Sequence, residues 1–399
     1  MKKQDLSPDR QKRLVRVEAY PGALALVPPP IPEELSIRGA ERDILAAHEA
    51  LSKAKSVAAH LPNPDLITRT LSRREAVQSS KIEGTQSGIG DLMEYESTGD
   101  AGGLPTDVTV TLNYVKALDT GLAAVRKYGA AALDIGMIQR LHRDLMQDTD
   151  YRDSPGEFRQ IQNWVGGLRI YDARFVPPPP AYLQELLHDL EQHLNYQPKG
   201  NAFLSVVTRM AMTHAQFETI HPFRDGNGRV GRLLMPMMLA AEGYPPIYLA
   251  GFLKSNQRLY YDSLLDVQLR GKWAEWVSFL AQAVIVSCHE SIQIANTLLN
   301  IRDSWEQKLS HTRRDSSSRK LANLLTGYPV MTANRASELL GVSFVAANNA
   351  IRDLVQSAIL SEPKSARNRV FVANSVIDLL NLPTHHEEIG SKQYPERFK

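Results

Sequence analysis

Apolar residues recur at one-face helical spacing over most of this chain, which predicts a mainly α-helical protein. The proline-bearing residues 1–35 and the stretch 95–107, which is poor in large apolar side chains, are expected to lack regular structure. The helices that this spacing predicts cover residues 35–61, 67–82, 108–127, 134–146, 182–194, 202–220, 230–242, 253–266 and 273–301.

A different pattern lies between residues 158 and 176, where apolar residues flank Gly166 and Gly167. Two short strands around a Gly-Gly turn fit this pattern, so a β-hairpin is predicted. Residues 177–180 are all proline and end the segment. They are either a recognition ligand for another domain or a stiff lead-in to the next helix, and proline in a first helical turn favours the second interpretation.

A small module follows the polar stretch 311–320, which has the composition of a hinge. Thr332 and Asn334 are alternative N-caps for its first helix, and a second helix is expected over 344–356. Residues 369–372 look like a strand. Helix, turn, helix and strand together predict a winged helix-turn-helix domain.

Composition narrows the class of protein without deciding its function. The chain has 399 residues, 43% of them hydrophobic and 23% charged, with a net charge of +2, which is ordinary for a protein of two or three domains. Its one cysteine, Cys288, excludes an intramolecular disulfide. The first residues lack the apolar run of a signal peptide, and no uninterrupted apolar stretch has the length of a membrane span, so we expect a cytoplasmic protein without a membrane partner.

The most informative segment is HPFRDGNGRVGR, residues 221–232. Its histidine can move a proton near neutral pH, and its aspartate can hold a hard cation. The glycines let backbone approach a ligand closely, and the arginines can fork onto phosphate oxygens. An apolar helix delivers His221, and the next helix is expected to begin near Gly228, where its unpaired amides favour an anion.

Spacing supports a phosphate site here. Gly226, Asn227 and Gly228 can form an anion nest, and Arg229 and Arg232 are three residues apart, so both can point from one helix face. The alternative is a glycine-rich turn between helices with solvated arginines. The whole segment favours the phosphate site, because each residue type supplies a different part of one phosphate chemistry.

Residues 221–232 match every defined position of HxFx[DE]GNGRxxR and so resemble the motif of the Fic (filamentation induced by cAMP) family. The resemblance extends from about residue 35 to about residue 300. It implies a helical-bundle core with a small β-hairpin flap, and an enzyme that moves AMP from ATP to a protein hydroxyl and releases pyrophosphate. The domains expected are an N-terminal helical region (1–107), the Fic catalytic domain (108–304), the winged helix-turn-helix domain (305–380) and a flexible tail (381–399).

The resemblance also implies residue roles. His221 would be the general base for a Ser, Thr or Tyr hydroxyl, and Asp225 would hold Mg²⁺. Gly228 stands where a phosphorylating relative of the family has lysine, which supports AMP transfer. The ATP-binding residues implied are Glu83, His221, Gly226, Asn227, Gly228, Arg229, Val230, Gly231, Arg232 and Tyr260.

Two further parts of the site follow from the resemblance. Tyr260 stands where the family packs a tyrosine near adenine, although a core aromatic pair with Tyr261 explains it equally well. Relatives often have asparagine where this chain has Gln268, so the chain departs from the family pattern at this position. The hairpin falls where the family places its target-docking flap, which binds a target segment by strand addition; its residues are Gln162, Asn163, Trp164, Val165, Gly166 and Gly167.

A brake is also expected. Ser79, Glu83 and Gly84 fit the pattern [ST]xxxE[GN], which resembles the inhibitory helix of the family. In isolation, serine and glutamate before a capping glycine are common at helix ends. Beside the complete motif, the pattern predicts that Glu83 pairs with Arg232 and so occupies the guanidinium that the γ-phosphate needs.

A different class of function is a DNA-binding regulator that acts through the winged helix. Asn348, Asn349 and Arg352 of its second helix can contact bases or phosphates, and Arg367 and Arg369 lie at the expected wing. That helix has a single cation and also an aspartate, so docking of protein targets is the favoured role for the module. A catalytically dead scaffold is disfavoured because no motif position is lost. Relatives often pair through exposed helices, so a homodimer is an expectation.

Overall fold

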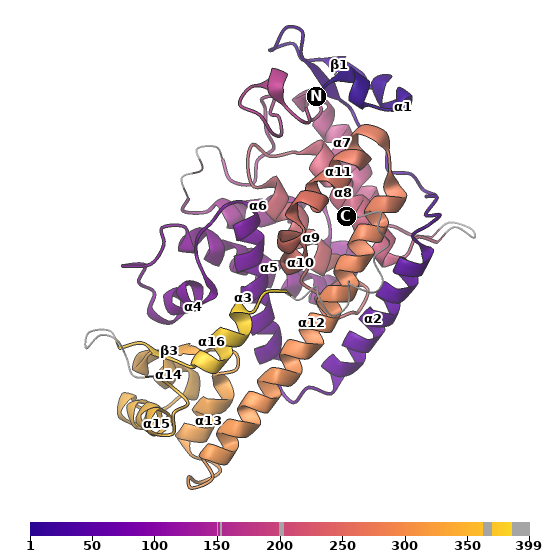
Figure 1. Cartoon of the computed structure of the whole chain (residues 1–399). Helices are drawn as coiled ribbons and strands as arrows, with labels where there is room; N and C mark the ends of the chain where they lie inside the picture. Colours follow the sequence, from indigo (N-terminus) through magenta and orange to yellow (C-terminus); the bar gives the residue numbers. More distant parts are fainter. Residues whose placement is uncertain (150, 152–153, 199–202, 362–368, 385–399) are drawn as a thin grey trace. The chain divides into compact units, whose positions relative to one another are not determined.

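The structure is a computed structural model that describes residues 1–149, 151, 154–198, 203–361 and 369–384. Contacts between Cα atoms divide the chain into two compact units. The first consists of Met1–Lys55 and Lys116–Ser287, and the second of Ser56–Val115 and Cys288–Lys399. Both units are mainly helical, as the sequence predicts (Figure 1).

The first unit carries the sequence motif. Its helices have ordinary start signals: Asp134 caps α6 by accepting a hydrogen bond from the Met137 amide, and Ser205 caps α8 through the Thr208 amide. The elements that lie in this unit, or extend into it, are α1 (Pro8–Gln11), β1 (Leu14–Arg16), β2 (Leu24–Leu26), α2 (Glu41–Ala59), α5 (Val108–Tyr128), α6 (Ile135–Met146), α7 (Leu183–Leu194), α8 (Val206–Ile220), α9 (Asn227–Ala241), α10 (Ala250–Ser255), α11 (Gln257–Arg270) and α12 (Trp273–Lys308), with 3₁₀ turns at Lys3–Asp5, Gly129–Ala132, Ile170–Asp172 and Pro180–Tyr182.

Helices α8 and α9 pack against each other at the centre of this unit. Every residue of α8 is buried, and α9 is buried from Asn227 to Leu239 except at Gly228. The α5 helix approaches α9 closely, since a Cβ atom at Gly121 would lie 2.1 Å from the Met237 methyl carbon. This dense packing holds the ends of α8 and α9, and therefore the motif between them, on a rigid base.

The second unit contains α3 (Pro64–Ile82), α4 (Ile89–Thr98), α13 (Ser317–Leu324), β3 (Val330–Met331), α14 (Ala333–Leu340), α15 (Phe344–Gln356), β4 (Phe371–Val372) and α16 (Asn374–Asn381). Thr332 is the N-cap of α14, which decides between the two candidate caps. Gly341 then ends α14 in the left-handed conformation, and Ser343 caps α15. Strands β3 and β4 pair antiparallel. Residues 362–368, which include Arg367 of the predicted wing, lie outside the described residues, and the winged form stays a prediction.

The α3 helix is anchored within this unit by buried charge. Arg74 forms an ion pair with Glu290 at 2.8 Å and donates hydrogen bonds to the backbone oxygens of Leu380 and Leu382. Arg73 pairs with Glu96 of α4 at 3.0 Å. Buried guanidinium groups with such partners fix the position of α3 among its neighbours in the second unit.

Several predicted elements differ from the observed ones, and three of them lie in residues 1–107 and 250–270. Residues 1–35 are not wholly irregular, because β1 and β2 pair antiparallel around a turn. The predicted loop 95–107 overlaps α4, which continues to Thr98 before Gly99 ends it. The predicted helix 253–266 is two helices, α10 and α11, that meet at Asn256. In the first two cases the element is short, so its apolar period is too weak to be recognised.

The α12 helix runs to Lys308, seven residues beyond its predicted end at residue 301. It is the one helix of the described residues that is long and apolar enough to cross a membrane, with a mean hydropathy of 1.3 over its most apolar window. That window is 61% buried within the structure, and length and composition alone are weak evidence, since buried core helices share them.

Candidate active site

The α8 helix places His221 at the start of the loop before α9. His221 is the C-cap of α8, with φ 50° and ψ 59°, a left-handed conformation that few non-glycine residues adopt. Its Nδ1 atom lies 3.3 Å from the backbone oxygen of Glu218. Because a carbonyl only accepts hydrogen bonds, this contact puts a proton on Nδ1 and leaves Nε2 able to accept one. A general base requires this protonation state.

The side chain of Glu218 lies beside the same nitrogen. Glu218 is 7% exposed, and its Oε2 atom lies 3.7 Å from Nδ1 of His221. Gln268 of α11 donates from Nε2 to the backbone oxygen of Glu218 at 3.4 Å. A carboxylate in this position stabilises the imidazolium that forms when a histidine base takes a proton.

The loop after His221 is closed by its own residues. Phe223 is fully buried, so its ring turns inward. The Asn227 side chain accepts a hydrogen bond from the Phe223 amide and donates one to the Phe223 carbonyl, both at 2.9 Å. Gly226 has φ 80°, and a Cβ atom there would lie 2.2 Å from the Met146 methyl carbon, so this position requires glycine. The Asn227 side chain therefore contributes by shaping the loop.

The α9 helix begins at Asn227, three residues before the predicted apolar helix 230–242 and one residue before Gly228, near which its start was expected. Its N-cap, Gly226, has no side chain to cap the first amides. Those amides and the positive end of the helix dipole are left available to an anion. The glycine-rich segment thus forms the helix N-terminus that the phosphate interpretation requires.

Both motif arginines are buried, Arg229 at 8% exposed and Arg232 at 1%. The Nε atom of Arg229 has no hydrogen-bond partner among the described residues. Its terminal nitrogen is 3.8 Å from Asp225, which is long for an ion pair. Because an incompletely paired buried cation costs free energy, a bound phosphate would complete the partners of Arg229.

Asp225 lies at the rim of the site, with its side chain 73% exposed. Its Oδ1 atom accepts a hydrogen bond from the Gly226 amide at 2.6 Å, and its Oδ2 atom is the one that lies 3.8 Å from the terminal nitrogen of Arg229. Among the described residues there is no group of three or more His, Cys, Asp or Glu that could hold a metal. A single exposed carboxylate suits a cation whose other ligands are water and phosphate oxygens, which is how Mg²⁺ is usually bound.

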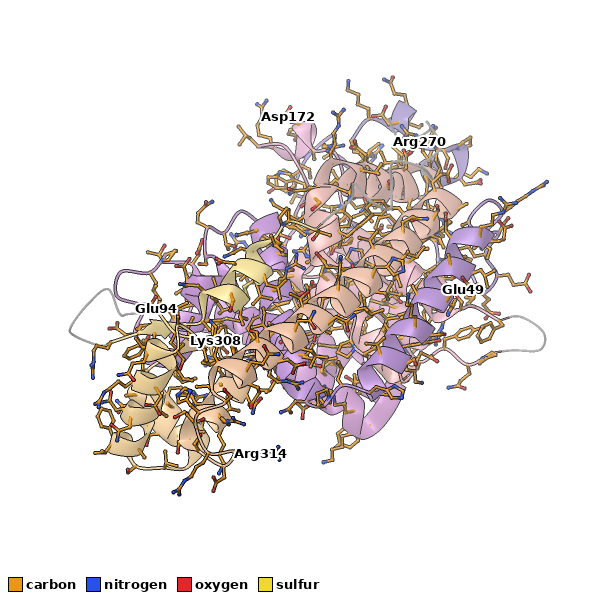
Figure 2. All side chains as sticks on the ribbon, turned by 60° about the horizontal axis from the view of Figure 1, so that its bottom comes forward. Glu49, Glu94, Asp172, Arg270, Lys308 and Arg314 are labelled. Atoms are coloured by element: carbon orange, nitrogen blue, oxygen red, sulfur yellow. The ribbon has the colours of Figure 1, made fainter. Side chains whose placement is uncertain are left out.

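The predicted hairpin is only partly formed. One isolated bridge joins Val165 and Phe175, and a 3₁₀ turn follows at Ile170–Asp172 in place of a second regular strand. Gly166 and Gly167 have φ of 69° and 88°, as the Gly-Gly turn requires. The outer edge is exposed, where Asp172 pairs with Arg169 at 3.0 Å (Figure 2).

The flap residues divide into two groups. Gln162 and Asn163 face inward: Gln162 donates to the Pro177 carbonyl at 2.8 Å, and Asn163 to the Phe223 carbonyl at 3.0 Å. Trp164 packs edge-on against Tyr20. Val165 is 38% exposed, and Leu168, beyond the two glycines, is 95% exposed. The flap therefore has an exposed apolar surface at Val165 and Leu168, and its first residues, Gln162 and Asn163, are held by hydrogen bonds.

Three residues implied to bind ATP lie deeper than the loop. Tyr260 is 1% exposed and bonds to Nε2 of His214 at 2.8 Å, which places its ring in the core. Val230 is fully buried. A Cβ atom at Gly231 would lie 2.6 Å from the Glu218 carboxylate, so this glycine permits close packing of α9 on α8.

Comparison with known proteins agrees with this geometry. The model of the Fic/DOC family N-terminal region matches residues 42–123, and that of the Fic/DOC family matches residues 132–239, which include the motif. The chain carries a Fic domain. The N-terminal match places the expected inhibitory segment, residues 79–84, within a region that the family also has.

Curated relatives of this Fic domain are named protein adenylyltransferase Fic. The protein of Aedes aegypti is 37% identical over 169 residues, which are 40% of this chain and 31% of the relative. That of Drosophila melanogaster is 32% identical over 171 residues, 42% of this chain and 32% of the relative. The matched region spans about a third of the length of these relatives.

Solved structures share the fold. A Fic domain containing signaling protein from Bacteroides thetaiotaomicron aligns with a TM-score of 0.53 and 22% identity, covering 64% of this chain and 97% of the other. A Fic family protein from Desulfovibrio desulfuricans aligns with a TM-score of 0.51 and 19% identity, covering 87% and 98%. At these identities the likeness establishes the Fic fold alone.

The segment that resembles the inhibitory helix ends α3, in the second unit. Ser79 is fully buried, and Glu83 is the exposed C-cap. Gly84 follows with φ 98°, and the Thr85 amide donates to the Ser80 carbonyl at 3.3 Å, as in a Schellman motif. The predicted glycine cap is confirmed, and it presents the Glu83 carboxylate at the end of the helix.

Sequence reasoning missed His142 of α6, which contacts the Fic loop, the residues 221–226 between α8 and α9. Its Nδ1 accepts a hydrogen bond from the Gly156 amide at 2.9 Å, and Nε2 donates to the Asp225 carbonyl at 3.1 Å. Burial lowers the pKa of His142 to about 4, so the ring is neutral at pH 7. The available signal was a histidine in the buried stripe of α6, between Ile138 and Leu145.

Proposed function

We propose that this chain is a protein adenylyltransferase that transfers AMP from ATP to a Ser, Thr or Tyr hydroxyl of proteins, itself included. The observation that carries the proposal is the placement of His221, whose Nδ1 faces the Glu218 carbonyl, beside an uncapped helix N-terminus and beside the buried Arg229, whose Nε has no hydrogen-bond partner among the described residues. Base, anion site and cation are the parts that phosphoryl-type transfer needs.

The proposed reaction is a single displacement. The target hydroxyl oxygen attacks the α-phosphorus of ATP while Nε2 of His221 takes the hydroxyl proton. The bond between the α-phosphorus and the oxygen that bridges to the β-phosphate breaks, and pyrophosphate leaves with that oxygen. The α9 amides and Arg229 hold the phosphates, and Arg232 neutralises the leaving group. The Glu218 carboxylate, 3.7 Å from Nδ1, stabilises the resulting imidazolium.

Mg²⁺ is the cofactor that the exposed Asp225 carboxylate fits. Bound there, the ion would supply charge neutralisation to the phosphates of ATP. The chain contributes one carboxylate oxygen, which the Gly226 amide orients through its bond to the other oxygen at 2.6 Å.

The target is proposed to bind along the flap by strand addition. Support comes from the extended backbone around Val165, which makes one bridge, to Phe175, and from the exposed apolar surface of Val165 and Leu168. Backbone pairing is indifferent to sequence, while those side chains favour an apolar residue in the target.

We further propose that Glu83 is a brake that acts by pairing with Arg232. Support comes from the pattern Ser79, Glu83, Gly84 at the end of α3 and from the Schellman ending, which presents the carboxylate. A bidentate bridge to Arg232 would remove that guanidinium from the γ-phosphate, so ATP would bind without reacting.

DNA binding through α15 is the second candidate, and the side chains favour protein docking instead. Phe344 and Val345, at the start of α15, are 51% and 68% exposed. The Asn348 side chain accepts a hydrogen bond from Arg369 at 3.2 Å, and Asp353 accepts one from Ser318. A helix with exposed apolar side chains, whose polar side chains Asn348 and Asp353 already accept hydrogen bonds, suits a protein partner better than the phosphates and base edges of DNA. A salt-dependent shift of duplex DNA by the whole chain would reverse this preference.

Mass spectrometry after incubation with ATP and Mg²⁺ tests the proposal. AMP adducts are expected on Ser, Thr or Tyr of the chain itself and of lysate proteins, and are expected to be absent with His221→Ala. Parallel reactions with GTP, CTP and UTP test the choice of nucleotide. Failure of both the natural chain and Glu83→Gly to form any adduct would refute the proposed activity.

A further inference from the structure

Arg159 lies at the root of the flap and reaches the end of the helix that carries the base. Its side chain is buried, with 4% of the residue exposed. Its Nε donates to the His221 carbonyl at 2.8 Å, and one terminal nitrogen donates to the Ile220 carbonyl at 3.3 Å and the Pro178 carbonyl at 2.6 Å. The other terminal nitrogen donates to the Ile161 carbonyl at 3.2 Å.

These four carbonyls come from three places. Ile161 lies on the outgoing limb of the flap and Pro178 on the returning limb, while Ile220 and His221 end α8. The Arg159 backbone adds a fifth bond, from its amide to the Pro222 carbonyl at 2.9 Å. One planar guanidinium thus ties both limbs of the flap to the backbone on either side of the catalytic imidazole.

The charge of Arg159 is balanced by dipoles. It makes no ion pair with a carboxylate in the part of the chain that the structure describes. Burial lowers its pKa to about 10, which still keeps the guanidinium charged at neutral pH. The negative end of the α8 dipole lies where its carbonyls accept these bonds, and it favours a cation.

His221 needs such a restraint. Its φ of 50° is unfavourable for a residue with a side chain. The conformation persists because its surroundings determine it, and the bond from Arg159 fixes the carbonyl of that residue. The same backbone angle sets the direction of the imidazole and its contact with Glu218.

We propose that Arg159 is a positioning residue that holds His221 in its left-handed conformation and couples the flap to it, so that a target strand laid on the flap finds the base aligned. The inference rests on the proposed transfer of AMP. Arg159 itself contacts neither nucleotide nor target in this scheme.

The test compares Arg159→Met and Arg159→Lys with a control, Arg140→Met, which removes an arginine that is half exposed on α6. Self-modification is measured with α-³²P-ATP over a range of ATP concentrations, in the natural chain and in a Glu83→Gly background. A misaligned base lowers kcat by about 100-fold in Arg159→Met, with KM for ATP changed less than about threefold. Lysine keeps the charge but reaches fewer carbonyls, so kcat is expected to fall about tenfold in Arg159→Lys.

A second measurement does not depend on activity. In protein labelled with ¹⁵N-histidine, the His221 ring signals, assigned from His221→Gln among 11 histidines, are expected to show the Nδ1–H form in the natural chain. In either Arg159 variant they should average between the two tautomers. Arg159→Lys serves this purpose if Arg159→Met does not fold, as judged by circular dichroism.

Two results would overturn the proposal: a folded Arg159 variant with a kcat within about threefold of the natural chain, or unchanged His221 ring signals in both variants. If the natural chain and Glu83→Gly form no AMP adduct, the proposed function fails, while the ring signals still decide whether Arg159 restrains His221.

Discussion

The imidazole of His142 stacks on the ring of Phe223, with centroids 3.8 Å apart and an interplanar angle of 2°. Both of its ring nitrogens are hydrogen-bonded as well, one to the Gly156 amide and the other to the Asp225 carbonyl. One side chain of α6 therefore holds the apolar anchor of the Fic loop and the backbone of the residue proposed to bind Mg²⁺.

His142→Phe separates these contributions, because phenylalanine keeps the stack and loses both hydrogen bonds. The buried Gly156 amide and the partly buried Asp225 carbonyl are then left without this partner, at a cost of about 1–3 kcal/mol. The expected result is a lower free energy of unfolding in urea, followed by circular dichroism. His188→Phe, at an exposed position on α7, is the control. Equal stability of His142→Phe and the natural chain would show that the two bonds contribute nothing.

His221→Ala is expected to abolish AMP transfer while ATP still binds. The imidazole supplies the base, whereas the anion site is made by α9 amides and Arg229, which the substitution does not touch. Transfer is measured with α-³²P-ATP, and binding by calorimetry with a non-hydrolysable ATP analogue. Retained transfer would remove His221 from the role of base; lost binding would mean that its ring also holds the nucleotide.

The helices were predictable where the apolar stripe was long. The prediction for residues 108–127 differs from α5 by a single residue, because a helix of this length repeats its period many times. Shorter elements were missed: α4 has ten residues, and β1 and β2 have three each. Their formation depends on tertiary contacts that a local pattern does not contain.

For the site, sequence reasoning identified the residues of the continuous motif, 221–232, because they are adjacent in the chain. It missed His142 and Arg159, which lie 83 and 62 residues from their loop partners. Such long-range bonds to backbone carbonyls leave no spacing to recognise. Tyr260 remained ambiguous for a related reason: only its bond to His214 places the ring in the core.

Asp225→Asn tests the proposed metal ligand. The amide oxygen can still accept the Gly226 amide, so the loop is expected to stay folded while the negative charge is lost. We expect AMP transfer to need a higher Mg²⁺ concentration, with a loss of about tenfold or more at a fixed low concentration. Asp9→Asn, at a site on α1 where the side chain is 91% exposed, is the control. If the Mg²⁺ dependence of Asp225→Asn matches that of the natural chain, Asp225 is not the ligand.

Glu83→Gly is expected to raise AMP incorporation, because it removes the carboxylate proposed to occupy Arg232. The gain is measured as the initial rate with α-³²P-ATP. A double variant, Glu83→Gly with His221→Ala, should show no transfer, which would establish that the gain arises at the same site. An unchanged or lower rate for Glu83→Gly alone would end the brake proposal.

Stability is expected to fall as the pH drops from 7 towards 4. Burial lowers the pKa of His142 and His193 to about 4 and that of His214 to about 3. In the unfolded chain each titrates near pH 6.5, so between these values the unfolded state binds more protons and gains about 1.4 kcal/mol per pH unit per histidine. His193→Gln removes one such group outside the proposed active site. Its unfolding free energy should therefore depend less steeply on pH, because unfolding then takes up one proton fewer. His188→Gln, exposed on the same helix, should keep the natural slope. If His193→Gln also kept that slope in urea titrations at pH 7, 6 and 5, His193 would not be buried in its neutral form.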